Sequence, residues 1–108
     1  SVENGSGFLA DLFVKLEHSK VRMPKYYEQD PADLFRHHVW INPFWEDKIS
    51  DVIGHMGADR VLFGSDWPHM EGLEQPRDIF TELDGVTLEQ QKVVLHDNAV
   101  ALNQRLPI

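Results

Sequence analysis

The chain has 108 residues, which is the size of one ordinary globular domain. Apolar residues make up 42% of it and charged residues 26%, so a disordered or fibrous chain is excluded. Ten Lys and Arg against eighteen Asp and Glu leave a net charge of −8, which argues against binding to nucleic acid or to an anionic membrane surface. The absence of cysteine excludes disulfides and thiolate metal sites. Because no apolar run reaches the ~20 residues that span a bilayer and no signal-peptide pattern is present, we expect a cytoplasmic protein.

The first predicted helix covers residues 7–19, where apolar residues recur at helical spacing. Ser6 is its candidate N-cap, and Asp11 and Lys15 are spaced to form an i, i+4 ion pair. A polar loop over 20–31 follows. The proline that ends this loop stands at a favourable first helical position and predicts one or two further helical turns.

Two short apolar strands are predicted, at residues 39–41 and 61–63. Asn42 and Pro43 end the first of them. Between the strands, apolar residues at i, i+3, i+4 and i+7 predict a helix over 45–56.

The remaining chain is expected to be helical. Pro76 opens one predicted helix, and Gly85 closes it. Thr87 and Gln90 form a capping box for the next helix, and Asn98 is the candidate N-cap of a last short one.

Two strands joined through one helix form a βαβ unit with a parallel pair. Two parallel strands do not make a stable sheet, because such sheets need cover on both faces and neighbours on both sides. We therefore expect the chain to be the end of a larger α/β protein, with no internal domain boundary between residues 1 and 108.

The most informative residues follow the second strand. Gly64 and Ser65 lead directly to Asp66, so this carboxylate stands at the carboxyl end of a buried strand, where α/β folds bind their ligands. A carboxylate there ligates metals or transfers protons. The alternative is structural: Asp66 caps a turn, or pairs with Arg60 or Arg77.

The run of residues 57–69, which ends in Gly-Ser-Asp-Trp-Pro-His, resembles the last barrel strand of the amidohydrolase-2 family of metal-dependent hydrolases and decarboxylases. Asp97-Asn98-Ala99 followed by Leu102 is similar to the family's closing helix, and residues 3–7 resemble the segment after its sixth strand. The resemblance covers essentially the whole chain. It implies a (β/α)8 barrel of about 250 residues or more, of which this chain would supply the end of strand six through strand eight and the terminal helices.

The resemblance also implies residue roles. Asp66 matches the family aspartate that ligates the metal or accepts a proton from the metal-bound water, and zinc is the expected metal. The family's other ligands, a His-x-His on strand one and a His on strand five, have no counterpart here. His37 and His38 precede their strand, away from the site, and do not replace them.

Four further residues are candidate substrate contacts. Glu3 stands where decarboxylases of the family carry a histidine. A side chain with an ordinary pKa near 4.3 there replaces one with a pKa near 6.5, which argues against decarboxylation and leaves hydrolysis or another metal-assisted step open. Trp67 and His69 follow Asp66 on the rim, with turn packing as the alternative role of each. Asn42 ends the neighbouring strand and faces the same rim.

The sequence thus predicts part of a metal-dependent hydrolase that acts on a small organic substrate through metal-activated water. The isolated chain is expected to be inactive and to need the remainder of the barrel, and a homo-oligomer is expected. A decarboxylase of the same family is one alternative. The other is a non-catalytic helical interaction module whose apolar faces bind a partner chain.

Overall fold

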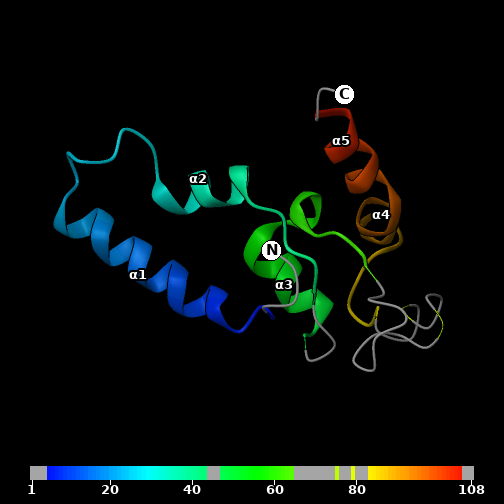
Figure 1. Cartoon of the computed structure of the whole chain (residues 1–108). Helices are drawn as coiled ribbons and strands as arrows, with labels where there is room; N and C mark the ends of the chain where they lie inside the picture. The colour runs from blue at the N-terminus through cyan, green and yellow to red at the C-terminus, as the bar shows by residue number, and fades with distance from the viewer. Residues whose placement is uncertain (1–4, 44–46, 65–74, 76–78, 80–82, 106–108) are drawn as a thin grey trace.

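The computed structural model describes residues 5–43, 47–64, 75, 79 and 83–105. Helices dominate these residues: α1 (Phe8–Arg22), α2 (Pro31–His38), α3 (Ile49–Met56), the 3₁₀ helix η1 (Ala58–Arg60), α4 (Leu88–Lys92), the π-helix η3 (Val93–Asp97) and α5 (Asn98–Arg105). The helices α1 and α2 pack together, α3 lies in the middle, and α4, η3 and α5 form one continuous run on the far side (Figure 1). In the part of the chain described here, no helix is long and apolar enough to cross a membrane.

The helix predicted over 7–19 is confirmed as α1, which continues to Arg22. The predicted ion pair also forms, with Lys15 Nζ 2.7 Å from Asp11 Oδ2. The prediction that Ser6 caps the helix through its side chain is wrong. The N-cap is Gly7, which makes no side-chain hydrogen bond, and the Ser6 hydroxyl instead donates to Asp47.

The second helix, α2, begins where its proline predicts. Asp30 is the N-cap, and its Oδ1 accepts hydrogen bonds from the N–H groups of Ala32 at 2.9 Å and Asp33 at 3.4 Å. Pro31 occupies the first helical turn. The N–H groups of that turn make no hydrogen bond within the helix, so the proline breaks none. The helix ends at His38, so the two histidines belong to its last turn.

The third helix, α3, is shorter than predicted. It begins at Ile49, so Asp47 precedes it, and residues 45 and 46 of the predicted span lie outside the described residues. Gly57 ends the helix with φ +85°, a conformation that side chains rarely adopt, and its N–H donates to Ile53 O at 2.8 Å.

The two predicted strands are adjacent and parallel, but they pair over a single bridge between Ile41 and Val61. Ile41 N–H donates to Arg60 O at 2.9 Å, and Leu62 N–H donates to Ile41 O at 2.8 Å. The expectation of two three-residue strands is therefore wrong for the described residues, where the helices surround one parallel contact.

Neighbouring elements explain why the pairing stops after one bridge. Before it, Val39 N–H donates to Phe35 O of α2, and Arg60 N–H donates to Gly57 O in the 3₁₀ turn. After it, the next donor of the ladder would be the N–H of residue 43, and Pro43 has none. Helix ends on one side and a proline on the other thus limit the ladder.

The parallel contact lies at the centre of the core. Ile41 is 1% exposed and Val61 0%, and α1, α3 and η3 bury residues against them. The main buried cluster consists of Leu9, Ile41, Val52, Met56, Val61 and Val94. A smaller cluster joins Ile49 of α3 to Leu83 and Val86.

The C-terminal run confirms one predicted cap and corrects another. Thr87 Oγ1 accepts from Gln90 N–H and Gln90 Oε1 accepts from Thr87 N–H, each at 3.1 Å, as the capping box predicts. The prediction that Asn98 is an N-cap is wrong, because its backbone is helical (φ −65°, ψ −39°) and the π-helix runs directly into α5. Most of the helix predicted after Pro76 lies outside the described residues. Its predicted end is a turn in which Gly85 has φ +77°.

Candidate functional site at the carboxyl end of the parallel pair

The predicted site residues divide into two groups. Asn42 belongs to the described part of the chain. The other predicted site residues, Glu3, Asp66, Trp67 and His69, lie outside it. At the carboxyl end of the parallel pair, the described part of the site consists of Asn42 and the residues that surround it.

The register of the parallel contact places Asn42 and Gly64 at one end. Asn42 follows Ile41 directly, and Gly64 lies three residues after Val61. Because the two segments are parallel and adjacent, both leave the core at their carboxyl ends and at the same edge. This confirms the predicted pairing of the two segments. The predicted convergence of Glu3 and Asp66 on that edge stays a prediction.

The Asn42 side chain packs closely against the backbone of Gly64. A Cβ placed on Gly64 would lie 2.8 Å from Asn42 Nδ2 and 3.3 Å from both Cγ and Oδ1. Real Cβ atoms do not approach other atoms to 2.8 Å, so this position requires a glycine while Asn42 keeps its place. The glycine that leads to Asp66 in the sequence is thus needed for close packing.

The carbonyl end of the Asn42 side chain has an unusual environment. Its Oδ1 is buried and accepts no hydrogen bond, which sets it apart from the other buried side-chain polar atoms of the described residues. A buried acceptor without a donor costs about 1–3 kcal/mol. A cavity of about 20 Å³ adjoins Asn42, and its other lining residues are Pro43, Ile49, Leu62, Phe63, Gly64, Ile79, Val94 and Leu95.

A second polar contact joins the segments that lead into α1 and α3. Ser6 donates two hydrogen bonds to Asp47 Oδ1, from its N–H at 2.8 Å and from its hydroxyl at 2.5 Å. Gly5, with φ +65°, allows the turn that brings Ser6 to this carboxylate. Ser6, which precedes α1, is thereby bonded to Asp47, which precedes α3.

The C-terminal helix holds the other segment of the parallel pair. Asn98 is 5% exposed, and its Nδ2 donates to Ala58 O and to Val61 O, both at 2.7 Å. These bonds use both N–H groups of the carboxamide. The Asn98 side chain, which the sequence analysis assigned to a cap, therefore fixes the start of the segment that leads to Gly64.

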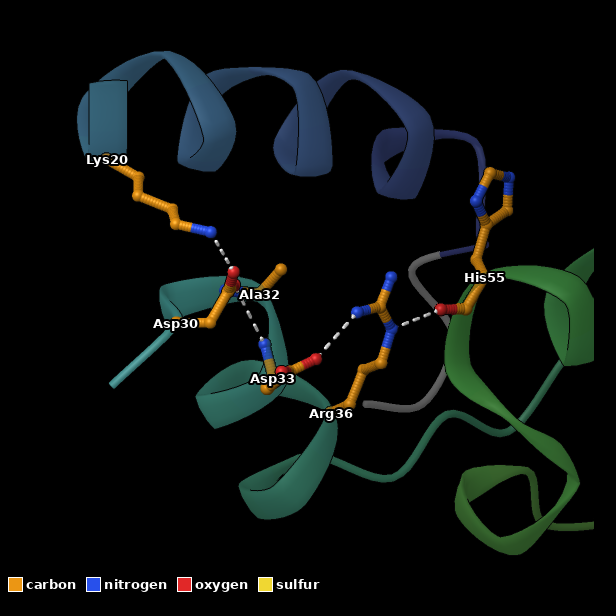
Figure 2. A network of polar contacts seen from close by, with 6 residues as sticks. All are labelled: Lys20, Asp30, Ala32, Asp33, Arg36 and His55. Carbon is orange, nitrogen blue, oxygen red and sulfur yellow. Dashed lines mark hydrogen bonds and ion pairs between the residues drawn. The ribbon is translucent and has the colours of Figure 1, made fainter. Parts of the chain in front are cut away.

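Basic and acidic side chains gather between α1, α2 and α3 (Figure 2). Lys20 of α1 reaches toward the Asp30 cap, with Nζ 2.5 Å from Oδ2. Arg36 donates from Nε to His55 O at 2.7 Å and from a terminal nitrogen to Asp33 at 3.2 Å, and its guanidinium stacks 4.3 Å from the Phe13 ring.

Three ionisable groups in the described residues have shifted pKa values. The hydrogen bond with Lys20 holds the pKa of Asp30 below its ordinary value, and the same bond raises the pKa of Lys20. The hydrogen bond from His96 likewise lowers the pKa of Asp97, and Lys92 adds to this effect. Lys20 lies on α1, Asp30 caps α2 and Asp97 lies on η3, and none of them lines the cavity beside Asn42.

The described residues do not form a metal site by themselves. They contain no group of three or more His, Asp or Glu side chains placed to hold one ion. His37 and His38 stack edge to face at 5.1 Å in the last turn of α2, at the amino-terminal side of the parallel pair, as their position before the strand predicts. A metal site that used Asp66 would need ligands beyond these residues.

Comparison with known proteins identifies the chain. The Amidohydrolase family profile matches residues 12–102. The chain belongs to the amidohydrolase family. A crystal structure of an amidohydrolase from Mycobacterium avium subsp. paratuberculosis K-10 is 39% identical over 94% of this chain, with a TM-score of 0.87. No protein with a curated description matches the chain.

The chain spans 27% of the length of that solved amidohydrolase. The amidohydrolase match implies a family built on the (β/α)8 barrel. The described residues alone show helices around one parallel bridge, which is less than a barrel. The amidohydrolase resemblance found in the sequence is thus confirmed, whereas the portion of the barrel assigned to this chain is still a proposal.

Proposed function

We propose that this amidohydrolase chain is the carboxyl-terminal part of a metal-dependent hydrolase that acts on a small organic substrate. The parallel contact between Ile41 and Val61 carries the proposal. It aligns two neighbouring segments so that Asn42 and Gly64 share one carboxyl edge, which is where (β/α)8 barrels hold their active sites. The match to a solved amidohydrolase over 94% of the chain supports the same reading.

In this proposal Asp66 is the catalytic residue that the chain contributes. It stands two residues after Gly64, and Gly64 is held against Asn42 at the carboxyl edge. Its carboxylate would ligate a divalent metal, zinc in this proposal, or take a proton from the attacking water. When bound, such a metal makes water a nucleophile near neutral pH. The remaining ligands would come from elsewhere in the complete protein.

Substrate contacts are proposed at the same edge. Asn42 supplies a carboxamide there, and Glu3, Trp67 and His69 are the further candidates from the sequence. The rest of the barrel would cover the outer edges of the parallel pair, since an open edge offers unpaired N–H and C=O groups to other chains. We also propose a cytoplasmic homo-oligomer for the complete protein.

The test compares the complete protein with two matched variants, Asp66→Asn and Asp84→Asn. Asp84 is exposed in the turn before α4 and serves as the control. Lactones, amides and small carboxylic acids are offered as substrates. Acid release reports hydrolysis, carbon dioxide release reports decarboxylation, and elemental analysis reports bound metal.

We expect hydrolysis by the wild type and by Asp84→Asn, with turnover of Asp66→Asn reduced at least about 100-fold, the lower range for loss of a general acid–base group. Activity of Asp66→Asn within a few-fold of wild type would remove Asp66 from the mechanism. Carbon dioxide release without hydrolysis would replace the hydrolase with a decarboxylase. A metal-free, inactive wild type that binds another protein would favour the interaction module.

A further inference from the structure

The segment of residues 61–64 is hydrogen-bonded along both of its edges. On one edge, Ile41 N–H donates to Arg60 O at 2.9 Å, and Leu62 N–H donates to Ile41 O at 2.8 Å. In a parallel pair, successive residues direct their N–H and C=O groups to alternate edges. The C=O group of Val61, which lies between the two bonded residues, therefore points to the edge away from Ile41.

A side chain of the C-terminal helices bonds this second edge. Asn98 Nδ2 donates to Val61 O and to Ala58 O, both at 2.7 Å, and Asn98 is 5% exposed. Asn98 stands where the π-helix η3 meets α5, and its own N–H donates to Val93 O, five residues earlier. Single π turns within helices are rare and occur frequently at functional sites. A buried carboxamide thus takes the place that a neighbouring strand would have beside Val61.

The bonds from Asn98 restrict a movement that the single parallel bridge allows. Both bonds to Ile41 lie on one edge, and the segment could still rotate about the line that joins them. A donor on the opposite edge prevents this rotation. Farther along, Gly64 packs so closely on Asn42 that a Cβ there would lie 2.8 Å from Nδ2, so a small rotation would alter this contact. The direction in which the chain leaves Gly64 toward Asp66 therefore depends on the Asn98 carboxamide.

We propose that Asn98 is a positioning residue for the catalytic carboxylate of Asp66. Asn98 contacts neither substrate nor metal in this role. It fixes the backbone of residues 61–64, and that backbone determines where Asp66 stands at the carboxyl edge. The inference rests on the proposed hydrolase function and gives the C-terminal helix a part in it. Loss of the carboxamide should lower kcat and leave KM nearly unchanged.

The test uses the complete protein, with Asn98→Ala as the variant and Thr87→Ala as the control. Thr87 Oγ1 accepts from Gln90 N–H in the capping box, so its loss destabilises the same C-terminal run through bonds that are local to the start of α4. Turnover of a substrate that the wild type hydrolyses is measured well below the unfolding temperature of every variant. Hydrogen exchange of peptides that cover residues 61–64 reports how firmly the segment is held.

We expect kcat of Asn98→Ala to fall by about 10- to 100-fold, as small displacements of catalytic groups do, with KM within about three-fold of the wild type. Exchange in residues 61–64 should become faster. Thr87→Ala should keep the wild-type kcat and exchange. An unchanged kcat of Asn98→Ala, or an equal loss in Thr87→Ala, overturns the proposal.

A second variant and the exchange measurement cover the remaining outcomes. Should Asn98→Ala not fold, Asn98→Ser replaces it, because its hydroxyl carries one donor instead of two, and an unchanged kcat of this variant overturns the proposal equally. A wild type that hydrolyses no substrate overturns the proposed function, and with it the catalytic role of Asn98. Faster exchange in Asn98→Ala would then show that the failure lies in the function and not in the bonds from Asn98 to the segment.

Discussion

The N–H and the hydroxyl of Ser6 both donate to the same oxygen of Asp47, at 2.8 and 2.5 Å, across 41 residues of sequence. Ser6 precedes α1, and Asp47 precedes α3 on the side where the chain leaves Ile41. The Asp47 carboxylate thus links the segment that precedes α1 to the segment that precedes α3. It also places Ser6 near the carboxyl side of the parallel pair, since Asp47 follows Ile41 on that side.

Replacing this carboxylate should loosen that side of the molecule. Asp47→Ala removes the acceptor of both Ser6 bonds, and we expect a loss of about 1.5–3 kcal/mol in the free energy of unfolding, typical of hydrogen bonds to a charged group. Urea unfolding monitored by circular dichroism measures it. Asp51→Ala is the control, since Asp51 is an exposed acidic residue in the first turn of α3. Equal losses in both variants would contradict a specific role for the Ser6–Asp47 contact.

Local signals in the sequence predicted most of the helices. Apolar spacing indicated α1, the proline at position 31 indicated the start of α2, and the Thr87–Gln90 pair indicated the start of α4. Each of these signals acts within about one or two helical turns, so it can be recognised without knowing the tertiary structure.

The wrong assignments concern side chains whose partners are distant in the sequence. Ser6 and Asn98 both have the residue types of helix caps, and their local sequence gave no reason for another role. Ser6 bonds a carboxylate 41 residues away, and Asn98 bonds carbonyl groups 40 and 37 residues away. Only the folded chain brings such partners together.

The Asn98 contacts give a sharp prediction because the side chain acts only as a donor toward Ala58 O and Val61 O. Asn98→Ala should cost about 1–3 kcal/mol, since it leaves a buried carbonyl without a donor. Asn98→Asp should cost more, because it places carboxylate oxygens against two carbonyl oxygens. Asn103→Ala, at an exposed position of α5, should change the stability by less than about 0.5 kcal/mol.

Thermal unfolding ranks these three variants. If Asn98→Asp is as stable as the wild type, the carboxamide does not donate to these carbonyls. A neutral result for Asn98→Ala would show that the C-terminal helix is held by its apolar contacts alone.

The close packing of Asn42 on Gly64 predicts a coupling between the two positions. Gly64→Ala introduces a Cβ 2.8 Å from Asn42 Nδ2, and overpacking of this kind costs about 1–3 kcal/mol. In an Asn42→Ala background the clash is absent, so the same change should cost clearly less. A double-mutant cycle measured by urea unfolding gives the coupling energy, for which we expect at least about 0.5 kcal/mol. Additive effects would mean that the two residues do not touch.

Less of the candidate site than of the helices could be predicted from the sequence. Parallel pairing of the two strands followed from the strand–helix–strand order, and the Ile41–Val61 bridge confirms it. The length of the pairing did not follow from that order. It depends on the N–H groups of Val39 and Arg60, which donate to carbonyls of α2 and of the 3₁₀ turn and not to the neighbouring segment. Pro43 was visible in the sequence as a strand end, but the ladder bond that it cannot make becomes evident only with the register.

The ion pair between Lys20 and Asp30 predicts a pH dependence of stability. The folded pKa of Asp30 lies below its ordinary value of 3.8, and that of Lys20 lies above 10.5, mainly because of their mutual hydrogen bond. The stabilisation from Asp30 is therefore complete above pH 3.8 and is lost as the pH falls through the lowered pKa. The part from Lys20 is complete below pH 10.5 and is lost as the pH rises through the raised pKa.

The variant Asp30→Asn isolates this ion pair, because asparagine caps a helix as well as aspartate does and keeps the N–H contacts of α2. The unfolding temperature of the wild type should exceed that of Asp30→Asn between about pH 5 and pH 9, and the difference should vanish in strong acid and shrink in high salt. Asp11→Asn, which breaks the more exposed pair with Lys15 on α1, should show a smaller difference throughout. A difference for Asp30→Asn that persists unchanged below pH 2 would mean that the charge of the Asp30 carboxylate does not produce it.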